Sequence, residues 1–423
     1  SGKSTVGKIV AETLNMRFLD MDEIISHKFN MPVSKIFESL GETTFRKAET
    51  QTLKKLARKK NFVVATGGGV YETPEHRNLI ANSGTSVFLD TSLSTISRRL
   101  GANQVGLRPL WTNTSDVEKL FNKRRGSYQQ CDLTVTTGEM TQGELSTKIC
   151  AAIFPHRDFV VDYEGYKSHV IATWDAPEVV GRFAKGRKTA VLTDRNVQKL
   201  HIERYLNVLD EPVVISVKPG EKSKSIRTAS YIYEKLLENR VERGDLLVAV
   251  GGGVITDVGG FIASTFKRGM DFILVGTSMV AGVDAAIGGK SAIDVGRIKN
   301  SVGLFTKPKV TVLDLSSLHT LKTSQLKEGL IEAYKTGLVA NPDLCSYIEQ
   351  NIRGLMQGSV IELSEVLTDS AKAKCDIVSK DFREKDLRRI LNLGHTYGHA
   401  VESFNNYSRS EEHTSELQSP YVI

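Results

Sequence analysis

Cysteine is scarce in this chain of 423 residues, which contains only Cys131, Cys150, Cys345 and Cys375. These residues lie far apart and show neither a CxxC spacing nor the Cys/His spacing of a structural metal site. That distribution argues against a disulfide-rich secreted domain and against a zinc finger. We therefore expect free thiols in a reducing compartment, and a cytoplasmic location.

Long apolar runs are missing as well. The most apolar stretch, Phe272 to Val283, lies between two aspartates and falls well short of the roughly 18 residues that a membrane-spanning helix needs. No basic and apolar signal pattern stands at the start of the sequence. Neither membrane insertion nor secretion is expected.

Aromatic residues make up only 7% of the chain, and no block of consecutive lysines and arginines is interleaved with them, although the net charge is +7. A dedicated nucleic-acid surface usually combines a basic patch with stacking side chains. We therefore expect small anionic metabolites as partners, and neither nucleic acid nor a membrane surface.

The length and apolar content allow two or three domains. Residues 1–152 alternate β-branched runs with amphipathic helical stretches, which predicts an α/β domain with a parallel sheet and flanking helices. The pattern lapses over 153–166, where we expect a linker. It resumes over 167–307 as a Rossmann-like α/β domain, and over 308–408 it becomes mostly helical.

The opening Ser1 to Thr5, followed by a helical pattern, matches the second half of the phosphate loop G-x-x-x-x-G-K-S/T. In such a loop the backbone N–H groups and the helix N-terminus surround phosphates, the lysine reaches the β- and γ-phosphates, and the hydroxyl binds Mg²⁺. The alternative is a chance match in a polar loop. The motifs downstream weigh against that alternative.

Five motifs follow in order: Asp20 to Asp22, Gly41 to Glu49, Gly67 to Gly69, Arg108 to Leu110, and Arg124. With the phosphate loop they resemble the shikimate kinases over nearly the whole first domain. The resemblance implies the P-loop kinase fold and phosphorylation of shikimate by ATP with Mg²⁺.

The resemblance gives each motif a role that suits its chemistry. Asp22 accepts hydrogen bonds from substrate hydroxyls, and Arg46 and Arg124 grip a carboxylate. The triple glycine lets the backbone approach the substrate ring. The predicted sets are ATP, with Gly2, Lys3, Ser4, Thr5 and Arg108; Mg²⁺, with Ser4 and Asp20; shikimate, with Asp22, Arg46, Gly67, Gly68, Gly69 and Arg124; and catalysis, with Lys3, Asp22 and Arg108.

Alternatives remain for the arginines of this set. A surface salt bridge with Glu42 or Glu49 is the alternative for Arg46, and a plain loop is the alternative for Arg108. Arg124 departs from the family pattern because Gly126 and Ser127 stand where proline and an apolar residue are usual.

A second triple glycine, Gly251 to Gly253, follows a hydrophobic run and opens a helical pattern, which suits pyrophosphate binding by backbone amides. With the segments Pro219 to Lys224, Val283 to Ser291, Ile331 to Gly337 and Leu391 to Ala400, it resembles the 3-dehydroquinate synthases from about residue 158 to residue 408. The resemblance implies cyclisation of 3-deoxy-D-arabino-heptulosonate 7-phosphate to 3-dehydroquinate with phosphate release. It also implies NAD, Zn²⁺ or Co²⁺ as cofactors, and a homodimer formed through this part.

The site residues of the second half are also implied by the resemblance. The NAD set is Asp194, Asn196, Glu221, Lys224, Gly252, Gly253, Asp257, Thr277, Ser278, Lys299 and Thr320. The substrate set is Asp284, Lys290, Asn300, Lys335, Lys374, Arg388, Asn392 and His399, of which Lys335 and His399 are the catalytic candidates. The zinc ligands are Glu332 and His395, an oxygen and an imidazole as zinc accepts.

His395 and His399 stand four residues apart in a helix that we predict from Arg388 to Ser403, so both can face one site. The alternative is a pair of helix histidines satisfied in a polar interface. The third zinc ligand of the family, a histidine in an H-G-E segment, is not found after Ala400.

Residues 409–423 include a stretch that matches a translated sequencing-library adapter, so we expect a non-native tail and do not count His413 as a ligand. A genuine polar tail is the alternative. With the incomplete phosphate loop, this predicts an impaired fragment of a longer gene. Two other functions stay open: another polyol-dehydrogenase-like enzyme in the second half, and a non-catalytic module with decayed sites.

Overall fold

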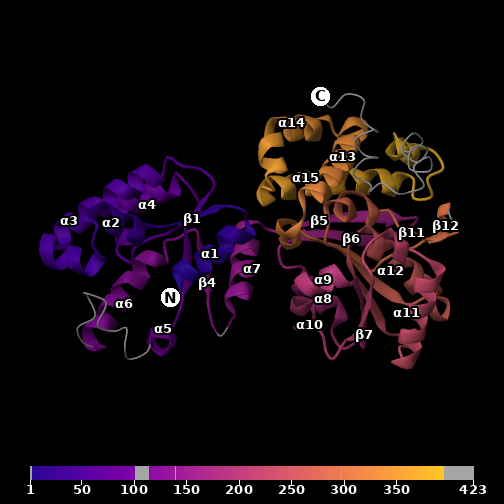
Figure 1. The fold of residues 1–423 in the computed structure, drawn as a ribbon, viewed down its shortest axis with the longest axis horizontal. Helices are drawn as coiled ribbons and strands as arrows, with labels where there is room; N and C mark the ends of the chain where they lie inside the picture. Colours follow the sequence, from indigo (N-terminus) through magenta and orange to yellow (C-terminus); the bar gives the residue numbers. More distant parts are fainter. Residues whose placement is uncertain (1, 101–113, 139, 297, 395–423) are drawn as a thin grey trace. The chain divides into compact units, whose positions relative to one another are not determined.

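The computed structural model describes residues 2–100, 114–138, 140–296 and 298–394. The chain divides into two compact units, Ser1–Phe154 and Pro155–Ile423 (Figure 1). Within the described ranges, no helix combines the length and the apolar character that crossing a membrane requires.

The first unit is built on two pairs of parallel strands. β1 (Arg17–Asp20) pairs with β2 (Phe62–Ala65), and β3 (Val87–Asp90) pairs with β4 (Leu133–Thr136). The helices are α1 (Lys3–Thr13), α2 (Met21–Phe29), α3 (Val33–Leu56), α4 (Pro74–Ala81), α5 (Leu93–Leu100), α6 (Thr114–Tyr128) and α7 (Gln142–Ile153), with the 3-10 turn η1 (Val70–Glu72). Parallel strands alternating with helices are what the sequence predicts for this half.

The second unit contains a seven-stranded sheet in the order β5-β6-β13-β10-β9-β7-β8. Its strands are β5 (Arg157–Tyr163), β6 (Tyr166–Thr173), β7 (Thr189–Asp194), β8 (Val213–Val217), β9 (Leu246–Gly251), β10 (Asp271–Gly276) and β13 (Val310–Asp314). β5 runs antiparallel to β6, and the other pairs are parallel. The α/β class predicted from the sequence is confirmed.

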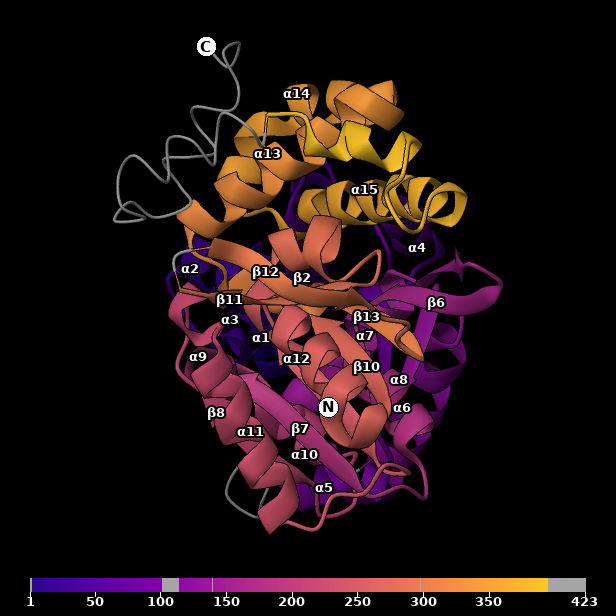
Figure 2. The same cartoon turned by 90° about the vertical axis from the view of Figure 1, so that its right-hand side faces the viewer.

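Helices cover both faces of this sheet (Figure 2). On one face α11 (Ile226–Glu238) and α12 (Gly253–Thr265) bury Ile232 and Ile262 against the strands. On the other face α8 (Ala176–Ala184) and α10 (Ile202–Leu206) bury Val180 and Tyr205. The short helix α9 (Arg195–Leu200) follows β7, and the antiparallel hairpin β11 (Lys290–Val295) and β12 (Ile298–Phe305) packs beside α12.

Two predicted boundaries in this unit are wrong. The linker expected over 153–166 contains β5, in which Val161 and Tyr163 are fully buried and the alternate positions are partly exposed. Charged residues, Arg157, Asp158 and Asp162, interrupt the apolar residues of this strand and hide it in a polar stretch. The helical part expected from residue 308 begins later, because β13 is a buried strand between β6 and β10.

The helical part consists of α13 (Thr323–Ala340), α14 (Pro342–Met356) and α15 (Val360–Lys380), which lie together above the sheet of the same unit in Figure 1. α15 packs against β5 and against the π-helical turn η5 (Ala281–Ala285).

The helix predicted from Arg388 to Ser403 is wrong at its start. Residues Leu387–Asn392 form a 3-10 segment, η7. The chain then leaves the helical conformation at Leu393, where ψ is 126°, and at Gly394, where φ is 82°. Positive φ favours glycine, so Gly394 ends the segment. His395 and His399 lie outside the described residues.

Candidate active sites

The predicted phosphate and magnesium residues of the first unit meet at the start of α1. Gly2 precedes the helix with a φ of 79°, and Lys3 and Thr5 lie in its first turn. The Ser4 hydroxyl donates to Asp20 Oδ2 at 2.6 Å. A hydroxyl and a carboxylate in contact are oxygen donors of the kind that Mg²⁺ accepts, and the free N–H groups of a helix start suit phosphate. Arg108 lies outside the described residues.

The triple glycine is crowded by the other predicted shikimate residues. A Cβ atom on Gly67 would stand 3.0 Å from Asp22 Oδ1, and one on Gly68 would stand 3.1 Å from Arg124 Nη1. A Cβ atom on Gly69 would collide with the Arg46 guanidinium. The absence of side chains here therefore lets three charged groups lie against the backbone of one turn.

The ion pairs offered as the alternative for Arg46 are present. Its guanidinium contacts Glu42 at 3.0 Å and the buried Glu49 at 2.6 Å. Burial raises the pKa of Glu49, and the Arg46 charge opposes that rise. Since the same guanidinium abuts Gly69, the ion pairs fix Arg46 beside the turn.

Two residues that the sequence reasoning missed support this part of the site: Glu72 holds Arg124, and Tyr128 holds the glycine turn. Its Nε donates to Glu72 Oε1 at 2.8 Å, and Tyr128 on the same helix α6 donates its hydroxyl to the Gly68 carbonyl. No local motif marks Glu72, because it reaches Arg124 across 52 positions of the sequence.

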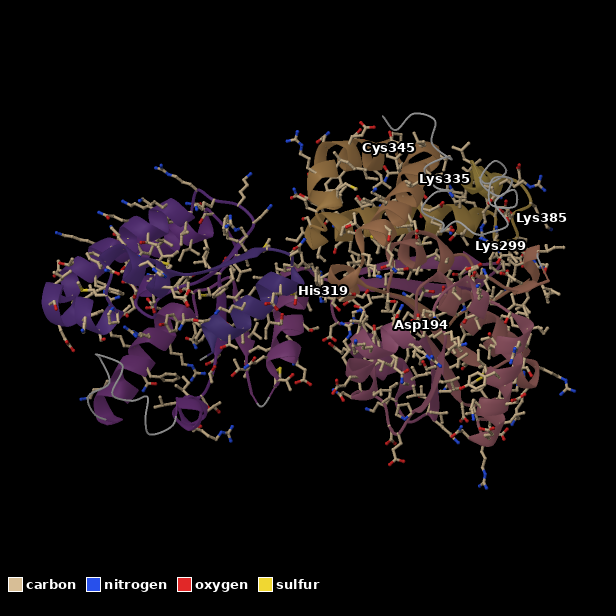
Figure 3. All side chains as sticks on the ribbon, in the orientation of Figure 1. Asp194, Lys299, His319, Lys335, Cys345 and Lys385 are labelled. Atoms are coloured by element: carbon tan, nitrogen blue, oxygen red, sulfur yellow. The ribbon has the colours of Figure 1, made fainter. Side chains whose placement is uncertain are left out.

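A cleft of about 1580 Å³ lies in the second unit, lined by residues that follow the carboxyl ends of β7, β9, β10 and β13. Ligands of open α/β sheets usually bind at that edge. Every residue of the predicted NAD set lines it: Asp194, Asn196, Glu221, Lys224, Gly252, Gly253, Asp257, Thr277, Ser278, Lys299 and Thr320. Figure 3 labels Asp194 at the end of β7 and Lys299 on β12.

The second triple glycine opens α12 into this cleft. No side chain caps the helix at Gly252, so its first N–H groups are available to an anion. A Cβ atom on Gly253 would stand 3.1 Å from the Ala285 side chain, which is tighter than normal packing allows. The turn therefore presents uncapped N–H groups of α12 to the cleft, as a phosphate cradle does.

A buried ion pair stands beside the cradle. Lys224 Nζ contacts Asp257 Oδ2 at 2.5 Å. Burial raises the pKa of Asp257 to about 6, although the Lys224 charge opposes the rise. For Lys224, burial favours the neutral form, but the Asp257 charge outweighs it and raises the pKa.

Six of the predicted substrate residues line the same cleft, together with the predicted zinc ligand Glu332: Asp284, Lys290, Asn300, Lys374, Arg388 and Asn392. Lys374 pairs with the Asp284 carboxylate, and its burial lowers its pKa. Arg388 is 2% exposed and donates to the carbonyls of Gly288 and Phe382 at 2.8 and 2.6 Å. Three cationic side chains, Lys290, Lys374 and Arg388, thus line one cleft.

Lys335 differs from the rest of its set, because it does not line the cleft but pairs with Glu332, which does. Burial and the Asp284 charge raise the pKa of Glu332. A divalent cation would relieve the repulsion between these carboxylates, so Glu332 fits the part of an oxygen ligand. Among the residues that the structure describes, no three His, Cys, Asp or Glu side chains come together around one metal position.

Glu384 is a cleft residue that the sequence reasoning missed. Its carboxylate pairs with Lys290 and accepts from Asn392 Nδ2 at 2.5 Å, so it bridges two members of the predicted substrate set. Its φ of 56° lies in the left-handed region, which non-glycine residues rarely adopt. The only signal in the sequence is a carboxylate four residues before Arg388.

His201, which the sequence reasoning also missed, lines the cleft. It makes the stability of this unit depend on pH. Burial lowers its pKa to about 4 against the attraction of Asp314, so its contribution to stability is complete above the ordinary value of 6.5 and is lost as the pH falls through about 4. We expect the free energy of unfolding of the wild type, relative to His201→Gln, to fall by about 3 kcal/mol between these limits. Urea denaturation across this pH range measures it.

The exposed His169 provides the matched control as His169→Gln. A wild-type advantage over His201→Gln that stays constant with pH would contradict the prediction.

Comparison with known proteins agrees with the two sites. A family model described as shikimate kinase matches residues 1–154. Models of the N-terminal and C-terminal parts of 3-dehydroquinate synthase match residues 214–328 and 329–415. The chain is thus a fusion of two enzyme domains, and the synthase is favoured over the polyol-dehydrogenase-like alternative.

A bifunctional shikimate kinase/3-dehydroquinate synthase from Thermotoga maritima is 33% identical over 410 residues, which are 95% of this chain and 78% of that protein. The chain belongs to the family of bifunctional shikimate kinase/3-dehydroquinate synthases, as the motifs predicted. A 3-dehydroquinate synthase from Brucella ovis is 38% identical over 241 residues, and the chain spans 63% of its length.

Solved structures share the fold of the second unit. ValA, a 2-epi-5-epi-valiolone synthase from Streptomyces hygroscopicus with NAD⁺ and Zn²⁺ bound, has a TM-score of 0.55 at 22% identity and covers 62% of this chain and 74% of its own. A 2-deoxy-scyllo-inosose synthase in complex with NAD⁺ and Co²⁺ has a TM-score of 0.57 at 22% identity and covers 62% and 73%.

Proposed function

We propose that the two units catalyse two reactions at separate sites. The first unit phosphorylates shikimate with ATP to give shikimate 3-phosphate. The second cyclises 3-deoxy-D-arabino-heptulosonate 7-phosphate to 3-dehydroquinate and releases phosphate. The observation that carries the proposal is that motif residues scattered along the sequence gather around one glycine turn in the first unit and one cleft in the second.

In the kinase site, the crowded turn explains how shikimate is held. Arg46 abuts Gly69 and Arg124 abuts Gly68, and two neighbouring guanidiniums suit a carboxylate. Asp22 beside Gly67 accepts from the hydroxyl that is phosphorylated. Lys3 and the start of α1 bind the phosphates of ATP. Bound Mg²⁺, held by Ser4 and Asp20, would supply charge neutralisation during transfer.

In the synthase site, Lys290, Lys374 and Arg388 neutralise the phosphate and carboxylate of the substrate, and the α12 cradle binds the NAD pyrophosphate. Related synthases hold NAD⁺ with Zn²⁺ or Co²⁺. When bound, these groups supply a hydride acceptor and a Lewis acid. Glu332 is the metal ligand proposed among the described residues, and Lys335, paired with it, orients that carboxylate.

The resemblance also supports a homodimer formed through the synthase unit. The four cysteines are free thiols, which supports a cytoplasmic location for the protein. Analytical sedimentation of the purified chain tests this proposal. A monomer at micromolar concentration would exclude the dimer.

Two product assays test the proposed activities. Inorganic phosphate should be released from the heptulosonate phosphate only when NAD and Zn²⁺ are present, and ADP should form only when shikimate is added. Oxidation of a polyol with reduction of NAD⁺ to NADH, and no release of phosphate from the heptulosonate phosphate, would support the dehydrogenase alternative instead. Failure to bind either nucleotide would support decayed sites.

Lys224→Met should raise the dissociation constant for NAD by about tenfold or more, because it removes a cation from the cleft and leaves the buried Asp257 unpaired. Isothermal titration of the full chain with NAD measures the change. Lys222→Met is the matched control, since Lys222 is exposed two positions away. Equal changes in the dissociation constant for the two variants would mean that NAD does not bind beside Lys224.

A further inference from the structure

His201 joins two elements at the edge of the cleft. It stands immediately before α10, is 7% exposed, and lies with its Nε2 2.9 Å from the Thr320 hydroxyl oxygen. Thr320 is the last residue of the 3-10 segment η6 (Leu315–Thr320), and both residues line the cleft. The contact therefore spans 119 positions of the sequence to reach a cleft residue.

The direction of this hydrogen bond follows from the other partner of Thr320. The Thr320 hydroxyl donates its one proton to the Ser317 carbonyl at 2.7 Å. It must therefore accept from His201, which requires a proton on Nε2. A hydroxyl oxygen has two lone pairs, so one remains for a donor in the cleft. His201 thus leaves Thr320 as an acceptor toward the cleft.

A buried carboxylate holds the two elements in place. Asp314, at the end of β13, accepts from the Tyr205 hydroxyl at 2.5 Å and from the Ser316 hydroxyl at 2.7 Å, and it pairs with Arg204. Arg204 and Tyr205 belong to α10, and Ser316 belongs to η6. The two segments that carry His201 and Thr320 are therefore both anchored to the Asp314 carboxylate.

We propose that His201 is a positioning residue, which orients the Thr320 hydroxyl to accept a hydrogen bond from a hydroxyl or amino group of the bound dinucleotide. This inference rests on the proposed binding of NAD in the cleft. On this proposal, His201 affects the affinity for NAD only by orienting Thr320.

A double-mutant cycle on the full chain tests the inference, with the dissociation constant for NAD measured by titration calorimetry. His201→Phe and Thr320→Val should each weaken binding about 2- to 10-fold. The double variant should bind no more weakly than Thr320→Val, because the two residues act on one hydrogen bond. His201→Gln, which restores an N–H donor, should recover most of the affinity.

His169→Phe is the matched control, since His169 lies on β6 and pairs with the exposed Asp158. Two results would overturn the positioning role while leaving NAD binding intact. One is a double variant in which the losses of NAD affinity of the two single variants add, and the other is a His201→Gln variant that binds NAD as weakly as His201→Phe. A wild-type chain that does not bind NAD would overturn the proposed function itself, and the inference with it.

Discussion

Asp314→Ala is expected to lower the free energy of unfolding of the second unit by about 3 to 5 kcal/mol. Asp314 is 1% exposed, and its carboxylate is shared by Arg204, Tyr205 and Ser316. Its removal leaves the half-buried Arg204 guanidinium without its counter-charge, and two hydroxyls lose an acceptor. Urea denaturation followed by the fluorescence of the buried Trp174 measures the loss.

The chain has two tryptophans, so the measurement is made in a Trp111→Phe background. Asp158→Ala is the control, because Asp158 pairs with His169 at the surface and should contribute less than about 1 kcal/mol. A loss for Asp314→Ala no larger than for the control would contradict the account of a buried anchor.

Asp22→Asn is expected to lower kcat/KM for shikimate by about two to four orders of magnitude. The amide keeps the size of the side chain but loses the charge that accepts the proton of the shikimate hydroxyl. The KM for ATP should change far less, since the phosphate residues lie at the start of α1. Coupled measurement of ADP with each substrate varied in turn separates the two effects.

Glu23→Gln serves as the control, because Glu23 is the exposed neighbour of Asp22 and has no place in the predicted site. If Asp22→Asn impaired the kinetic constants for shikimate and for ATP equally, Asp22 would not be a shikimate-binding residue.

The residues that we predicted to face ligands belong to short local motifs. The structure brings Asp22 and Gly68 together at one glycine turn, and Gly252 lines the cleft. The residues that orient the side chains of the sites do not belong to such motifs. Glu72 orients Arg124 from 52 positions away, and Asp314 binds Arg204 across 110. Such partners are chosen by the tertiary fold, which no short pattern records.

The same limit applies to the strands. The apolar or β-branched runs 62–65 and 133–136 predict two strands, and β2 and β4 have these bounds. β5 was missed because charged residues interrupt its apolar run. β13 was assigned to the wrong part because the helices that follow it obscure its place in the sheet.

The place of β13 also sets an order of events during synthesis. β13 is the only strand that joins the β5–β6 pair to the β10-β9-β7-β8 group, as far as the sheet is described. Until residues 310–314 leave the ribosome, these two pieces have no hydrogen bonds in common, and the exposed edges of β6 and β10 face solvent or chaperones. The nascent chain must therefore keep two incomplete sheets from pairing with other chains, a burden typical of folds with long-range parallel pairing.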